Sequence, residues 1–153
     1  MTPTSVDQKV IAQRALLISD MISSIQDLHP EGKEAFLSDR HKVAAAESYL
    51  RRSLEALFDI GRHILAKEFG YPATEYKEVA KGLFAKKVLK QIEADLMREM
   101  AGYRNRMVHF YHEITPEELH RICLRHLGEI KMLVEKLLLR TEKPRRPNPK
   151  TKK

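Results

Sequence analysis

The chain has 153 residues, of which 42% are hydrophobic and 32% charged, with no Trp, six Gly and a formal net charge of +7. This length fits one domain, and this composition favours a helical globular protein over a β-sandwich or a disordered chain. No apolar run approaches the roughly 20 residues that span a bilayer, no secretory signal begins the chain, and Cys123 has no second cysteine to pair with, so we expect a soluble, cytoplasmic protein with no membrane contact.

Apolar residues recur at helical spacing in four long blocks. The first block covers residues 10–28 and ends near His29 and Pro30. The second follows a short segment at residues 31–39, covers residues 43–64 and ends at Gly70. The looser segment that comes next predicts a short helix capped by Thr74.

The third long helix is predicted over residues 89–107, and the fourth begins at Thr115 and continues to about Leu137. Thr115 is the expected N-cap, Pro116 suits the first helical position, and Glu118 would complete a capping box. No alternating strand pattern competes with these helices. The sequence therefore predicts an all-α fold, an up-and-down helical bundle of four long helices plus a short helix, in one domain at residues 1–140.

The C-terminal segment is strongly basic. Residues 140–153 hold seven Lys or Arg and one Glu, so they contribute +6 and leave about +1 for the rest of the chain. Residues 141–153 contain three Pro and no apolar residue, which predicts a disordered basic tail. Such a tail is either a solvated end or an aid in holding an anionic partner such as RNA.

A polar cluster lies at the C-terminal end of the third long helix. It consists of Arg104, Asn105, His109 and Tyr111, all within eight positions. If the stripe from residue 96 to residue 107 faces the core, Arg104 lies about 70° from its centre, whereas Asn105 and His109 lie about 170° and about 150° away. On this outward side the cluster is joined by the apolar residues Met97, Ala101 and Val108. Apolar residues beside exposed polar ones suggest a partner surface, and we expect a homodimer in which two copies bring Arg104 and His109 to one cleft.

The chemistry of these side chains suits RNA cleavage without a metal. An imidazole titrates near neutral pH, so His109 can remove the 2′-hydroxyl proton or protonate the leaving oxygen. The guanidinium of Arg104 matches phosphate oxygens, and Asn105 can orient the ring or the substrate. Cleavage of this kind would leave a 2′,3′-cyclic phosphate.

The run "RNRMVHFY" at residues 104–111 resembles the R-x4-H-x-Y signature of the HepT toxins of the HEPN superfamily, and the block "LEALFDIGRHIL" is also similar to this family. The resemblance covers most of residues 5–140 and does not extend to the basic tail. It implies a toxin of a type VII-like toxin–antitoxin pair, a metal-independent endoribonuclease that works as a homodimer with Arg104 and His109 as catalytic residues and Asn105 in support. It also implies a small nucleotidyltransferase antitoxin that silences the toxin by attaching AMP to the motif tyrosine, here Tyr111.

Two other functions stay open. One is a non-catalytic helical accessory subunit that binds a nucleotidyltransferase and presents its substrate, although such subunits generally lack the Arg-x4-His motif. The other is a helical scaffold whose basic tail binds nucleic acid without chemistry.

Several remaining residues are interpreted as structural. His109 and His112 lie three positions apart, but no Cys pair or His-Glu-x-x-His pattern accompanies them, so we expect neither a metal nor another cofactor. Asp59 and His63 have the i, i+4 spacing of a bonded pair on the second long helix. Cys123, on the apolar stripe of the last helix, is expected to act as a small hydrophobic side chain.

Overall fold

Seven helices make up the described part of the chain, residues 6–109 and 114–142 of a computed structural model. They are α1 (Gln8–Gln26), α2 (Lys33–Ser38), α3 (Arg40–Phe69), α4 (Tyr76–Ala85), α5 (Gln91–Val108), α6 (Pro116–Arg125) and α7 (Leu127–Glu142). No strand occurs in these two ranges. The all-α prediction is therefore confirmed.

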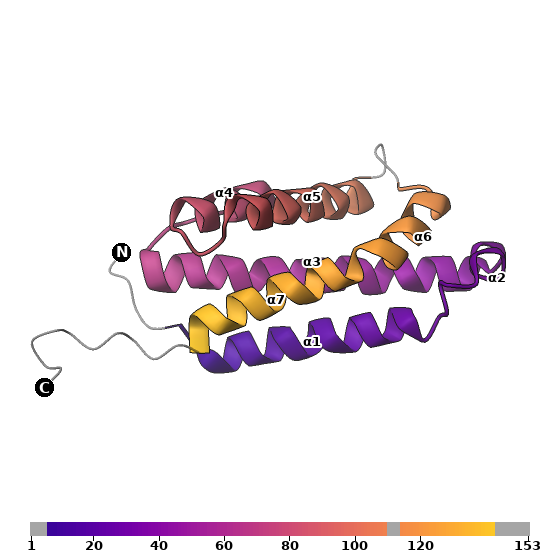
Figure 1. Ribbon diagram of the computed structural model, residues 1–153, viewed down its shortest axis with the longest axis horizontal. Coiled ribbons are helices and arrows are strands. Elements are labelled where there is room, and N and C mark those ends of the chain that lie inside the picture. Colours follow the sequence, from indigo (N-terminus) through magenta and orange to yellow (C-terminus); the bar gives the residue numbers. More distant parts are fainter. Residues whose placement is uncertain (1–5, 110–113, 143–153) are drawn as a thin grey trace, which may run out of the picture.

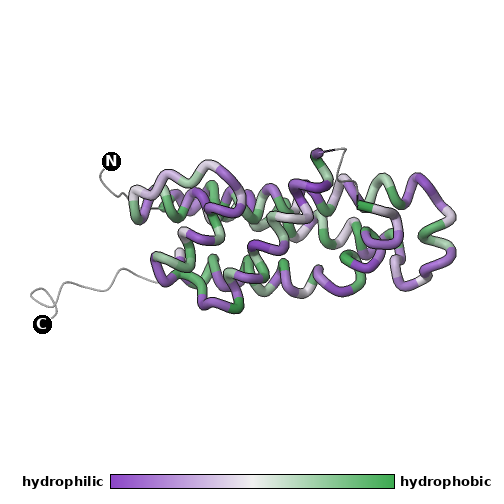
Figure 2. The backbone as a smooth tube through the Cα atoms, turned by 90° about the horizontal axis from the view of Figure 1, so that it is seen from above, coloured by the Kyte–Doolittle hydropathy of each residue, from purple (hydrophilic) through white to green (hydrophobic). Residues whose placement is uncertain are grey.

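The long helices run up and down along one common direction (Figure 1). Helix α3 lies at the centre, with α1 along one side and the α4–α5 pair along the other, while α6 and α7 cross in front of it. Hydrophilic and hydrophobic stretches follow each other in short turns along the backbone (Figure 2). The buried apolar residues of the helices form one shared core, as those of amphipathic helices in a bundle do.

The core is built around α3, which is buried at eleven positions along its length. Its largest fully buried side chains include Phe58, Leu54, Leu57 and Ile64. Gly70 ends the helix in the left-handed region at φ 61°, and the N–H of Tyr71 donates to the carbonyl of Leu65 at 2.9 Å. Gly at this position stops the helix without a Cβ clash, so the predicted end of the second long block is confirmed.

The predicted fourth helix consists of two helices, α6 and α7, because the helical conformation is interrupted at His126. His126 is the C-cap of α6, at φ −107° and ψ −6°, and α7 begins at the next residue. The apolar stripe continues through the break, so periodicity alone could not locate it. The His126 ring lies 2.8 Å from the carboxylate of Glu129 on α7 and 3.7 Å from that of Glu99 on α5, and these contacts accompany the change in direction.

Two of the predicted caps differ in detail. Glu75, not Thr74, is the N-cap of α4, and the backbone N–H of Thr74 donates to the carboxylate of Glu78. Thr115 caps α6 as predicted, since its hydroxyl accepts from the N–H of Glu118. The carboxylate of Glu118 does not close the expected capping box but pairs with Arg106.

No helix in the described ranges is long and apolar enough to cross a membrane. The predicted basic tail at residues 141–153 lies, apart from its first two residues, outside the described part of the chain. The division into a domain at 1–140 and a tail at 141–153 stays a prediction.

Candidate functional site

Arg104 lies near the end of α5 with its side chain 23% exposed. Its Nε and Nη2 both donate to Oε2 of Glu55 on α3, each at 3.2 Å. Glu55 also accepts from Arg51, one turn earlier on α3, at 2.9 Å. A guanidinium held through two of its nitrogens has little freedom to turn, so α3 sets the direction of the Arg104 side chain.

An aromatic ring supports the same guanidinium from another helix. The central carbon of the Arg104 guanidinium lies 4.2 Å from the ring centroid of Tyr76, the first residue of α4. The Tyr76 ring stacks on Phe58 of α3, with centroids 4.9 Å apart and planes 13° from parallel. Burial raises the pKa of the Tyr76 phenol, so the ring remains neutral near pH 7. Arg104 is therefore fixed by a carboxylate and by the face of an anchored aromatic ring.

Asn105 and His109 complete the described part of the cluster. Arg104 Nη1 donates to the side-chain oxygen of Asn105 at 3.4 Å. The backbone N–H of His109 donates to the backbone carbonyl of Asn105 at 3.0 Å, and His109 is the C-cap of α5 in an extended conformation. The His109 side chain is exposed. The structure thus brings Arg104 and Asn105 into contact and leaves the His109 imidazole accessible to solvent.

Tyr111 lies in residues 110–113, outside the described part of the chain. The helices before and after these residues, α5 and α6, are joined by an ion pair. Arg106 of α5 donates to both oxygens of Glu118 of α6, at 2.6 and 2.7 Å. This hydrogen-bonded pair lowers the pKa of Glu118 and raises that of Arg106. The end of α5, which carries His109, is thereby tied to the start of α6.

The predicted orientation of α5 is wrong for two apolar residues. Met97 and Ala101 were expected on the outward side, but both are fully buried. They lie on the same face of the helix as Arg104, because positions three, four and seven apart share a face. Helix α5 packs on both α3 and α4 and so buries a wider face than one stripe. Val108 is exposed, as expected.

The predicted Asp59–His63 pair is also wrong. Asp59 pairs instead with Arg14 of α1, at 3.1 Å, and with Arg62, at 3.6 Å. His63 Nε2 accepts from the backbone N–H of Asp7 at 3.0 Å. Asp59 is thus bonded by Arg14 of α1 and by Arg62 of α3 itself, and His63 by the N-cap residue of α1.

Cys123 is buried in the core, and burial raises the pKa of its thiol to about 12. A thiol that stays protonated at neutral pH is a poor nucleophile. Cys123 is therefore a small hydrophobic side chain, as predicted.

A family model described as "Ribonuclease HepT-like" matches residues 18–137, which include Arg104, Asn105 and His109. The chain belongs to the HepT-like ribonuclease family. No curated protein matches this HepT-like chain in a sequence search.

Solved structures share the fold of this HepT-like protein at low sequence identity. One, described as a tri-AMPylated Shewanella oneidensis HEPN toxin in complex with MNT antitoxin, is 22% identical with a TM-score of 0.78, covering 85% of this chain and 97% of its own. A toxin–antitoxin with AMP-PNP is 22% identical with a TM-score of 0.76, covering 84% and 97%. A mutant of the toxin–antitoxin MntA–HpeT is 21% identical with a TM-score of 0.77, covering 85% and 98%.

Sequence reasoning missed the part that four residues play in this HepT-like site, namely Glu55, Tyr76, Arg106 and Glu118. Glu55 lies 49 positions before Arg104. The i, i+4 spacing of Glu55 and Arg51 indicates a pair on one helix. The neighbouring sequence does not indicate that Glu55 also accepts a hydrogen bond from the distant Arg104. Glu118 gave a signal that was interpreted as a helix cap.

Proposed function

We propose that this HepT-like protein is the toxin of a toxin–antitoxin pair and cleaves RNA as a metal-independent endoribonuclease. The observation that carries the proposal is the fixed guanidinium of Arg104, in contact with Asn105, on the helix end that presents an exposed His109. The proposal is also supported by the family to which the chain belongs.

The reaction needs only these groups. One His109 removes the proton of the 2′-hydroxyl, the 2′-oxygen forms a bond to phosphorus, and the bond from phosphorus to the 5′-oxygen breaks. The second His109, from the other copy in a homodimer, gives a proton to the departing 5′-oxygen. Arg104 stabilises the negative charge that builds on the phosphoryl oxygens. The products are a 2′,3′-cyclic phosphate and a 5′-hydroxyl.

Single substitutions test the proposal against a matched control. His109→Ala and Arg104→Ala should each lower the rate of RNA cleavage by about 10²–10⁴-fold, the usual contribution of an acid–base or charge-stabilising group. His41→Ala removes an exposed histidine at the start of α3 and should leave the rate unchanged. Cleavage should persist in EDTA. Wild-type rates in His109→Ala, or a rate restored only by added metal, would contradict the mechanism.

The same variants separate the toxin from an accessory subunit. If the protein only presents a substrate to a nucleotidyltransferase, the wild type should not cleave RNA, and His109→Ala should bind that enzyme as the wild type does. If it is the nuclease, expression should arrest growth and His109→Ala should relieve the arrest.

We further propose that a nucleotidyltransferase antitoxin attaches AMP to Tyr111. Nucleotide phosphate at this position would place negative charge and bulk two residues from His109, where RNA phosphate must bind. The AMPylated HEPN toxin among the similar structures supports this idea. After co-expression with the antitoxin, mass spectrometry should find AMP on the Tyr111 peptide, and Tyr111→Phe should stay unmodified and toxic. An unmodified Tyr111 in a silenced complex would contradict the proposal.

A further inference from the structure

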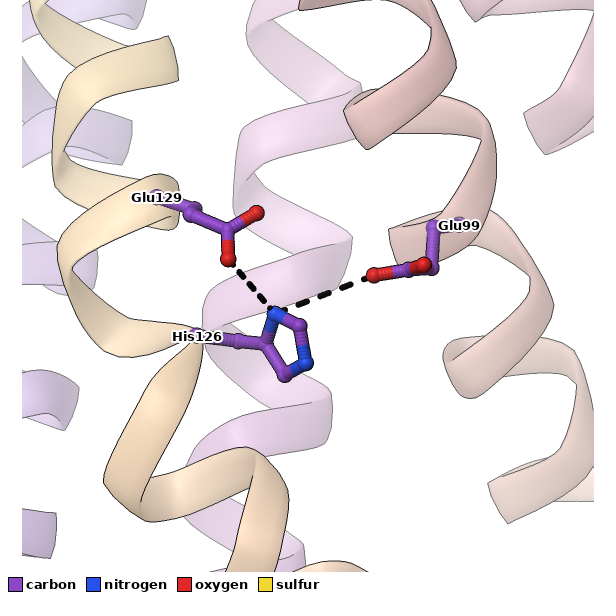
Figure 3. Close-up of side chains that lie close together, drawn as sticks. All are labelled: Glu99, His126 and Glu129. Carbon is purple, nitrogen blue, oxygen red and sulfur yellow. Dashed lines mark hydrogen bonds and ion pairs between the residues drawn. The ribbon is translucent and has the colours of Figure 1, made fainter.

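A second group of titratable side chains lies where α5 faces the junction of α6 and α7 (Figure 3). Glu99 comes from α5, His126 is the C-cap of α6, and Glu129 lies in the first turn of α7. Nδ1 of His126 lies 2.8 Å from Oε1 of Glu129 and 3.7 Å from Oε1 of Glu99. One nitrogen and two carboxylate oxygens, all within 4.8 Å of one another, thus converge from three elements.

The separations suit a shared cation. Metal–ligand bonds of about 2.0–2.2 Å place the ligands of one ion about 3–4.5 Å apart. The 3.7 Å distance from His126 to Glu99 lies in this range, and the 2.8 Å distance from His126 to Glu129 would have to widen slightly. The Glu99 side chain is 47% exposed, so it can rotate toward an ion without disturbing the core. Two carboxylates this close repel each other unless positive charge lies between them.

The carboxylate of Glu129 has an unused oxygen. Its Oε1 lies 2.8 Å from Nδ1 of His126, while its Oε2 is buried from solvent and has no hydrogen-bond partner within the described residues. Leaving a buried carboxylate oxygen without a partner is unfavourable. A divalent ion bound by this carboxylate would supply the missing positive charge.

The second ring nitrogen of His126, Nε2, also has a partner. Nε2 of His126 lies 3.5 Å from the hydroxyl oxygen of Tyr103, with ring centroids 5.5 Å apart. Metal-binding histidines almost always donate from their second nitrogen to an oxygen, which fixes the tautomer and aims the ligating lone pair. The hydroxyl oxygen of Tyr103 is placed to accept such a bond.

The site is open to solvent on one side. A cavity of about 480 Å³ lies beside it, and Glu99 is the ligand that lines this cavity, together with Asp95 and the cations Lys77, Arg98 and Arg106. An ion can therefore be reached by water from the side of Glu99.

We propose that Glu99, His126 and Glu129 bind one divalent transition-metal ion per chain, with Zn²⁺ preferred over Mn²⁺. An imidazole nitrogen with two carboxylate oxygens is a donor set that both ions accept, and N/O sites bind Zn²⁺ more tightly than Mn²⁺. None of the three ligands belongs to the proposed nuclease site, so the ion has a structural role and takes no part in RNA cleavage.

The ion would add to the polar contacts between α5 and the α6–α7 junction. Beyond this cluster, Lys136 of α7 pairs with Glu93 of α5 at 3.8 Å, and Arg106 of α5 pairs with Glu118 of α6. Both cations are partly exposed, and ion pairs near the surface contribute little to stability. A bound ion would join α5 to the α6–α7 junction by coordination instead, and so hold the helix that carries Arg104 and His109.

The experiment uses the full chain without an affinity tag, freed of metal, with Zn²⁺ as the probe in calorimetry and in thermal unfolding. The wild type should bind one Zn²⁺ per chain, and free Zn²⁺ at about 100 times Kd should raise Tm by about 5–10 °C. Glu99→Gln and Glu129→Gln should each weaken binding by at least about 10–100-fold, the loss usual for a supporting residue alone. The apo Tm of each variant reports whether it still folds, and exposed Glu99 is the safer of the two positions.

Two controls make the result specific. Glu31→Gln removes the carboxylate from the exposed His29–Glu31 pair, which is 2.9 Å apart, and should leave Zn²⁺ binding unchanged. The double variant His109→Ala/His112→Ala removes the histidines nearest Tyr111 and should also bind as the wild type does. Wild-type affinity in folded Glu99→Gln, binding lost in either control, or no binding by the wild type would each overturn the proposal. Loss of RNA cleavage in the metal-free protein would instead contradict the metal-independent nuclease.

Discussion

Arg104 is placed by side chains from two other helices, and this has consequences at the scale of a single residue. Glu55 takes the Nε and Nη2 edge of the guanidinium, and Tyr76 covers its face. Nη1, on the other edge, reaches Asn105. Glu55 is therefore a positioning residue that acts through Arg104.

Glu55→Gln should lower the rate of RNA cleavage by about tenfold or more, because small displacements of a charge-stabilising group are costly. KM for RNA should change less than kcat, since Arg104 keeps its charge. The matched control is Glu68→Gln, which removes another Glu–Arg pair from α3, that with Arg140 of α7. Cleavage assays on both variants decide the matter, and equal rates in Glu55→Gln and the wild type would show that Arg104 needs no such support.

At the scale of helices, the position of α5 depends on close packing at one glycine of α3. A Cβ built on Gly61 would lie 2.8 Å from Val79 of α4, 3.0 Å from Leu83 of α4 and 3.2 Å from Met97 of α5. Both helices therefore approach α3 at a point where a side chain has no room.

Gly61→Ala should lower the free energy of unfolding by about 1–3 kcal/mol, because overpacking outweighs the gain in helix propensity. Gly102→Ala on α5 is the control, since a Cβ there meets nothing within 4 Å. It should raise the free energy of unfolding by up to about 1 kcal/mol. Urea denaturation measures both values, and a Gly61→Ala protein as stable as Gly102→Ala would mean that α4 and α5 adjust easily.

At the scale of the whole molecule, the homodimer is still a prediction. Burial of Met97 and Ala101 removes two residues from the apolar surface expected beside His109, and Val108 remains exposed there. A dimer that shares the RNA cleft would have to form around this end of α5.

Light scattering should give the mass of two chains for the wild type, and Val108→Glu should give one chain and no RNA cleavage. Ile92→Glu is the control, because Ile92 is more exposed and lies on the same helix 16 residues, or about 24 Å, away. It should leave both the mass and the cleavage unchanged. A wild-type monomer that cleaves RNA at full rate would refute the shared cleft.

Local chemistry along the chain was enough to predict the long helical blocks and the candidate residues, but not the short helix α2 or the division between α6 and α7. Hydrophobic periodicity, the Gly70 stop and the Thr115 cap depend on neighbours within a few positions, and the motif at residues 104–111 is contiguous. These features therefore predicted an all-α bundle and placed Arg104, Asn105 and His109 at the end of one helix.

Tertiary structure alone decided how that helix is turned and what holds it. The contacts of Arg104 with Glu55 and Tyr76 join distant segments, and the contact of Arg106 with Glu118 joins α5 to α6. The break at His126 likewise coincides with contacts to α5 and α7 that a continuous apolar stripe does not reveal. Two side chains pair when folding brings their atoms within bonding distance. The local sequence pattern does not contain the distances between residues that are far apart in the chain.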